Sequence, residues 1–130
     1  MGKGNHATGP FIATDIASIA AATTTTSFTA VEVPVWDIET IALMAFVTGG
    51  HASASGAVDF NFVGSVDGVT WGTNIVKTVT VTMSGAAKIV KTDQLDMTGY
   101  HSLKLYSIQN KDANYTATLV NVWWGKNYWF

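Results

Sequence analysis

The sequence of 130 residues contains no cysteine, no arginine and only two prolines. The missing cysteines exclude disulfide bonds and thiolate metal sites. The missing arginines remove the side chain best suited to bidentate recognition of phosphate, and the lysines are scattered along the chain without a basic run. Nucleic acid is therefore not an expected partner.

Charge of either sign is scarce. Charged residues make up 12% of the chain, against about 25% in an average soluble domain. The net charge is −2, and threonine, serine, asparagine and glycine take the place of the charged residues. A surface with so little charge protects a free monomer poorly against association. We therefore expect this chain to function inside an assembly.

Long hydrophobic runs are also missing. No window approaches the 18 apolar residues of a membrane-spanning helix, and no polybasic patch could bind a membrane surface. Asp15 interrupts the apolar run that begins at Phe11, which makes a poor secretory signal. We expect synthesis in the cytoplasm, no membrane partner and a later location outside the cell.

Strand signals dominate what is present. Between Val58 and Phe62 apolar residues alternate with Asp59 and Asn61, which is typical of an extended strand with one apolar face. Similar signals recur along the chain, separated by turn residues. They predict an all-β fold: a single antiparallel β-sandwich, jelly-roll-like, with seven or eight strands.

The segment Thr40–Thr48 differs from the other predicted strands because it is apolar on both faces. A strand of this kind is normally covered by other elements on both sides. We therefore expect a central strand that is buried on both of its faces.

A turn follows the alternating segment. Asp67 and Gly68 form a strong turn signal, since glycine accepts positive φ and aspartate can accept a hydrogen bond from backbone two residues on. Trp71 comes directly afterwards. We expect it to anchor the turn, largely buried near the face formed by Val58 and Phe62.

Two regions are expected. Residues 1–26 should form an extended N-terminal arm with a short helical or irregular segment, and residues 27–130 should form the β-sandwich domain. The glycine-rich start is typical of an arm, and Asp15–Ala22 could form one helical turn. Whether the arm packs on a neighbouring molecule or on its own domain is left open.

Catalytic motifs are not found. His6, His51 and His101 stand far apart, and no nucleophile elbow or phosphate-binding loop occurs. The aspartates are interpreted as turn caps, with a Ca²⁺ site left as an open alternative. We expect no enzymatic activity, no catalytic residue, no cofactor and no resident metal.

Aromatic residues crowd the end of the sequence. Trp123 and Trp124 are neighbours in a predicted strand and must point to opposite faces, so only one of them can enter the core. Exposed tryptophan and tyrosine favour a subunit interface and also form sugar-stacking platforms. We favour the interface, with these candidate contacts: Gly2, Phe11, Ile12, Trp123, Tyr128, Trp129 and Phe130.

Two segments carry a family resemblance. Phe62–Trp71, with its Ser-x-Asp-Gly-x-x-Trp hairpin, and Asp96–Leu105, with Thr-Gly-Tyr before a strand, resemble discoidin-like sandwiches and small phage virion proteins. The resemblance covers about residues 57–125. Discoidin-like sugar-binding modules are usually longer and commonly carry an arginine after the tyrosine, where this chain has His101 and Lys104.

These departures favour the virion proteins, and the chain looks more like a tailed-phage capsid decoration (cement) protein. The resemblance implies a location on the capsid surface and binding to the major capsid protein or other virion subunits. It also implies a homo-oligomer, with a trimer favoured. The alternative function is a carbohydrate- or receptor-binding module of a phage fibre or a secreted protein.

Overall fold

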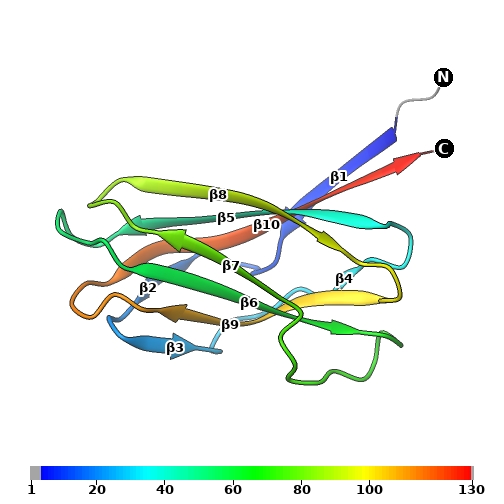
Figure 1. Ribbon diagram of the computed structural model, residues 1–130, viewed down its shortest axis with the longest axis horizontal. Helices are drawn as coiled ribbons and strands as arrows, with labels where there is room; N and C mark the ends of the chain where they lie inside the picture. Colours follow the sequence, from blue (N-terminus) through cyan, green and yellow to red (C-terminus); the bar gives the residue numbers. More distant parts are fainter. Residues whose placement is uncertain (1–3, 130) are drawn as a thin grey trace.

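The computed structural model describes the backbone of residues 4–129 and the side chains of residues 6–127. Ten β-strands and no helix occur in this part of the chain (Figure 1). The predicted all-β fold is therefore confirmed. In chain order the strands are β1 (Gly4–Pro10), β2 (Ile16–Ile19), β3 (Thr23–Thr25), β4 (Val33–Pro34), β5 (Thr40–Gly49), β6 (Ala57–Ser65), β7 (Lys77–Thr82), β8 (Lys88–Asp96), β9 (Ser102–Asn110) and β10 (Ala117–Trp129).

The strands form two antiparallel sheets that pack face to face. One sheet has the order β1-β10-β5-β8 with β2 also on β10, and the other has β3-β9-β6-β7 with β4 also on β9. Since β1 and β2 share one edge and β3 and β4 share another, the ten strands fill eight positions. This arrangement is the jelly roll of two four-stranded sheets, which confirms the predicted architecture.

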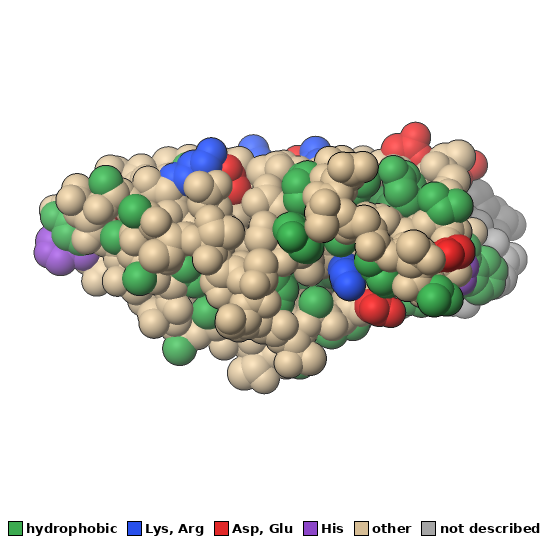
Figure 2. Space-filling model, turned by 90° about the horizontal axis from the view of Figure 1, so that it is seen from below, with side chains coloured by type: hydrophobic (Ala, Val, Ile, Leu, Met, Phe, Trp, Pro, Cys, Tyr) green, Lys and Arg blue, Asp and Glu red, His purple; other side chains and the backbone are tan. Residues whose placement is uncertain are grey.

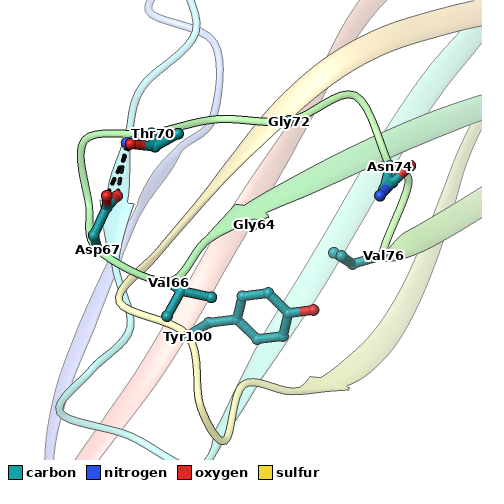
Figure 3. Close-up of a pocket in the computed structure, with 8 residues that line it drawn as sticks. All are labelled: Gly64, Val66, Asp67, Thr70, Gly72, Asn74, Val76 and Tyr100. Carbon is teal, nitrogen blue, oxygen red and sulfur yellow. Dashed lines mark hydrogen bonds between the residues drawn. The ribbon is translucent and has the colours of Figure 1, made fainter.

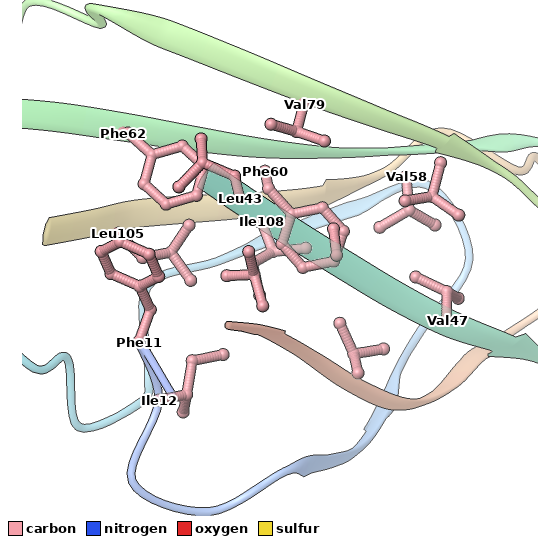
Figure 4. Close-up of a cluster of buried hydrophobic side chains, with 14 of the residues drawn as sticks. Phe11, Ile12, Leu43, Val47, Val58, Phe60, Phe62, Val79, Leu105 and Ile108 are labelled. Carbon is pink, nitrogen blue, oxygen red and sulfur yellow. The ribbon is translucent and has the colours of Figure 1, made fainter. Parts of the chain in front are cut away.

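The core lies between the two sheets. Figure 4 shows aromatic and aliphatic side chains from both sheets meeting there, among them Phe60 and Phe62 of β6, both fully buried. The ring of Phe11 meets Phe62 edge to face, with centroids 5.0 Å apart. The segment from Val58 to Phe62 is therefore a strand with one apolar face, as its alternation predicts, because every second side chain enters this core.

Polar pairs close the outer face of the β3-β9-β6-β7 sheet. The Asp59 carboxylate accepts a hydrogen bond from the Thr80 hydroxyl at 2.6 Å and lies 2.7 Å from the Lys111 ammonium. Beside this pair, the Thr78 hydroxyl donates to the Asn61 side chain at 2.8 Å. These cross-strand contacts satisfy the polar groups of this face within the sheet.

The N-terminal region differs from expectation. Within residues 4–26, β1, β2 and β3 all pair with the long strands of the sandwich, so this segment is part of the two sheets and is not an arm separate from them. The helical turn expected between Asp15 and Ala22 is wrong, since Ile16–Ile19 is a strand on β10. Pairing with β10 and β9 supplies the backbone hydrogen bonds that a short helix would otherwise have supplied.

One buried carboxylate joins the loops at one end of the sandwich. Asp112 accepts hydrogen bonds from the backbone N–H groups of Asn114 and Gly56 at 2.9 Å, and further ones from Tyr115 and Ser55. The donors at Asn114 and Gly56 lead the causes that lower the pKa of Asp112 from 3.8 to about 2. The segment after β9 is thereby fixed to the start of β6.

We predict that Asp112→Asn lowers stability at neutral pH and flattens its acid dependence. The pKa of the Asp112 carboxyl group is lower in the folded state than in the unfolded state. The carboxylate therefore contributes its full share to stability above about pH 4, and this share is lost as the pH falls through about 2. Urea unfolding between pH 7 and pH 2 measures it, with the exposed Glu32→Gln as control. A variant curve that runs parallel to the parent curve over the whole range would contradict the assignment.

Candidate functional sites

Strand β5 is apolar on both faces, but the fold covers only one of them. Its inward side chains, such as Leu43 and Val47, are buried in the core. On the outward face Met44 is 40% exposed and Phe46 is half-buried. The expectation that this strand is buried on both sides is therefore wrong, because the β1-β10-β5-β8 sheet has no second layer over it within residues 4–129.

Neighbouring strands extend this apolar surface. Met44 pairs across the sheet with Trp123 of β10, and Phe46 pairs with Val90 of β8. Directly paired residues of an antiparallel sheet share one face, and Trp123 and Val90 are 37% and 50% exposed. The apolar face patch thus consists of Met44, Phe46, Val90 and Trp123. The Lys88 ammonium lies 4.5 Å from the centre of the Phe46 ring.

The predicted interface residues fall into three groups. Trp123 belongs to the apolar face patch, while its neighbour Trp124 packs inward against the core. Phe11 and Ile12 are not surface contacts, because the turn after β1 places both in the core, 0% and 1% exposed. The remaining candidates lie outside the described residues or have only their backbone described: Gly2, Tyr128, Trp129 and Phe130.

The ends of β1 and β10 extend beyond the two sheets as a two-stranded ribbon (Figure 1). The pairing of β10 with β5 ends at Gly125, so Lys126–Trp129 pairs only with β1. The base of the ribbon is held by the buried Lys126, whose ammonium donates to the Pro34 carbonyl at 2.5 Å and lies 3.4 Å from Asp37.

The loop between β6 and β7 is built around Asp67. Its carboxylate accepts hydrogen bonds from the backbone N–H groups of Thr70 at 2.6 Å and Val69 at 2.8 Å, and from the Thr70 hydroxyl at 2.8 Å. These donors, led by the Thr70 N–H, hold the pKa of Asp67 well below its usual value. Gly68 has a φ of 79°, and a Cβ added there would clash with the His101 ring. Asp67 and Gly68 therefore organise a turn.

Trp71 does not anchor this turn in the core. Its side chain is half-buried, and the centre of its ring lies 4.4 Å from the Lys104 ammonium nitrogen. Lys104 pairs with Val63, which lies on the opposite face of β6 from Phe62. The expected burial of Trp71 beside Val58 and Phe62 is wrong, because the loop carries the indole toward the outer face of the sheet.

The same loop frames an open pocket of about 430 Å³ (Figure 3). The Tyr100 ring enters it from the segment before β9 and lies against Gly64, where an added Cβ would come within 2.6 Å of the ring. Sequence reasoning missed this pocket. The available signal was Gly64 itself, since a glycine inside a strand marks the close approach of another group. The lining residues are Gly64, Val66, Asp67, Thr70, Gly72, Asn74, Val76 and Tyr100.

Several other acidic side chains make structural contacts. Asp93 lies 2.9 Å from the Lys77 ammonium, and this contact leads the causes that lower the pKa of Asp93. Within the described chain, no group of three or more histidine or acidic residues is placed to hold a metal ion. The same residues contain no helix long and apolar enough to cross a membrane.

No protein-family model matches this chain, and no curated protein sequence matches it. Solved structures do resemble it. A chain from the structure of infectious bursal disease virus, Gx strain, is 10% identical with a TM-score of 0.52, over 95% of this chain and 32% of the viral chain. Murine APRIL is 12% identical with a TM-score of 0.52, over 94% of this chain and 99% of its own.

A xylan-binding CBM22-1 domain from Paenibacillus barcinonensis Xyn10C is 13% identical, over 98% of this chain and 97% of its own. Its TM-score is 0.47. At identities this low, the likeness to the other two structures shows the fold alone.

We predict that Gly64→Ala lowers stability by about 1–3 kcal/mol, the usual cost of overpacking. The new methyl group would come within 2.6–2.7 Å of Tyr100 ring carbons, so the ring must move out of its position. Gly72→Ala is the matched control, because the nearest atom to its added Cβ is 4.0 Å away. Urea unfolding measures both variants, and equal midpoints would show that the ring does not pack on Gly64.

Proposed function

We propose that this chain is a non-enzymatic structural subunit of a virion, a decoration protein that binds the outer shell of a tailed-phage capsid. The observation that supports the proposal best is the second apolar face of β5. Its outward side chains Met44 and Phe46 are joined by Val90 and Trp123 in one patch on a sheet that lacks a covering layer in the described chain. Contiguous apolar surface of this kind marks a protein interaction site.

The contrast between the two sheets supports this assignment. The outer face of the β3-β9-β6-β7 sheet is closed by polar pairs such as Asp59 with Thr80. Figure 2 shows another side of the molecule, where hydrophobic and uncharged polar surface lies between scattered charged side chains. A partner that covers the apolar face patch would therefore gain hydrophobic burial and would have to desolvate little charge beyond the Lys88 ammonium.

The proposed partner is the major capsid protein of the shell. A specific, stable contact buries at least about 1,000 Å² in total, so the capsid surface must cover the strands around the patch as well. The jelly-roll fold, which also occurs in viral capsid proteins, is compatible with this role. The expected homo-oligomer, with a trimer favoured, stays a prediction within the same proposal.

We predict that Val90→Lys weakens attachment to the shell at least about tenfold, which corresponds to about 1.4 kcal/mol. Val90 is 50% exposed, so the variant should fold while it places a charge in the centre of the contact. The measurement is co-sedimentation at limiting concentration with capsids of the encoding phage that were assembled without this chain.

The matched control is Val69→Lys, at a site that is 82% exposed in the loop between β6 and β7. It adds the same charge away from the apolar face patch and should bind like the parent. Equal binding by all three proteins would remove the patch from the interface. Failure of the parent chain to bind any capsid would overturn the proposed function itself.

A further inference from the structure

We propose that the pocket between the β6–β7 loop and Tyr100 binds a neutral sugar ring of a glycan. This site is distinct from the apolar face patch. The pocket lies at the end of β6 in the β3-β9-β6-β7 sheet, whereas the apolar face patch lies on the outer face of the β1-β10-β5-β8 sheet. A subunit docked through the patch would therefore present this pocket to its surroundings.

The walls of the pocket combine aromatic and aliphatic surface. Figure 3 shows the Tyr100 ring extending into the space beneath the loop, with Val66 on one side and Val76 on the other. A sugar ring has apolar C–H faces that stack on aromatic rings and hydroxyl groups around its edge. The volume of about 430 Å³ lies within the range of about 300–1,000 Å³ typical of small-molecule sites.

Two polar groups in the pocket have no internal partner. Within the described residues, the Tyr100 hydroxyl and the Asn74 side-chain amide make no hydrogen bond, and both belong to side chains that line the pocket. A hydroxyl and an amide both donate and accept, which suits the mixed donors and acceptors of sugar hydroxyl groups. They can therefore orient a sugar over the apolar walls.

The charges around the pocket favour a neutral ligand. No lysine lines it, and its one carboxylate, Asp67, is already bonded to the N–H and hydroxyl groups of Thr70 and to the N–H of Val69. A phosphate, sulfate or carboxylate group would find no cationic partner there. A neutral glycan, in contrast, needs only the aromatic ring and the free amide and hydroxyl groups.

The test begins with an array of neutral glycans ending in glucose, galactose, mannose or N-acetylglucosamine, with sialylated and sulfated glycans as the charged arm. We expect the intact chain to bind a neutral glycan. Titration of ¹⁵N-labelled protein with the monosaccharide at the end of that glycan should shift the amide signals of Gly72 and Asn74.

Three variants assign the site. Asn74→Ala, at an exposed position, should fold normally and weaken binding about tenfold, and Tyr100→Ala should abolish it. Tyr100→Phe keeps the ring and should retain partial affinity. Val90→Lys should bind sugar like the parent although its attachment to the shell is weakened, which separates this proposal from the proposed function. No binding to any neutral glycan, binding only to charged glycans, or unchanged affinity in Asn74→Ala and Tyr100→Ala would each overturn it.

Discussion

The most consequential physical constraint in this structure is the uncovered apolar face of β5. In a two-layer sandwich each sheet buries one face, so a strand normally alternates apolar and polar residues. In β5 the inward residues, including Leu43, complete the core, while Met44 and Phe46 point away from it. The other sheet shows the ordinary solution, because its outer face is closed by pairs such as Asp59 with Lys111. Within the described residues one sheet thus keeps an apolar outer surface, and this asymmetry between the two sheets is the basis of the proposed partner contact.

Two carboxylates of this chain build loops. Asp112 and Asp67 each accept several hydrogen bonds from nearby N–H groups, and in both cases these bonds lower the pKa of the carboxyl group. Such loops keep a defined shape through local hydrogen bonds, since a chain without cysteine has no disulfide to hold them. The loop around Asp67 can therefore stand over Tyr100 and hold a pocket open. Rigid loops on a jelly-roll framework are common places for binding residues.

The long strands could be predicted from the sequence because their alternation is local. Over residues 58–62 apolar and polar side chains alternate with the two-residue period of a strand. The turn at Asp67 follows from the local chemistry of aspartate and glycine. The N-terminal strands could not be predicted, since β1 and β3 consist mostly of glycine, threonine and other residues without alternation, and their partners lie far along the chain. Phe11 looked like an exposed anchor because only the tertiary fold places it against Phe62. The pocket exists only after β9 pairs with β6, which brings Tyr100 to Gly64.

The most direct test of the uncovered face is the oxidation of methionine side chains by hydrogen peroxide, read by mass spectrometry. Met44 is 40% exposed, whereas Met83 and Met97 are buried and serve as internal controls. Exposed methionine converts readily to the sulfoxide. In the isolated chain Met44 should therefore oxidise much faster than the other two. In the chain bound to capsids, Met44 should become protected to the level of Met83. An oxidation rate of Met44 that stays the same in the free and the bound chain would contradict the claim that a partner covers this face.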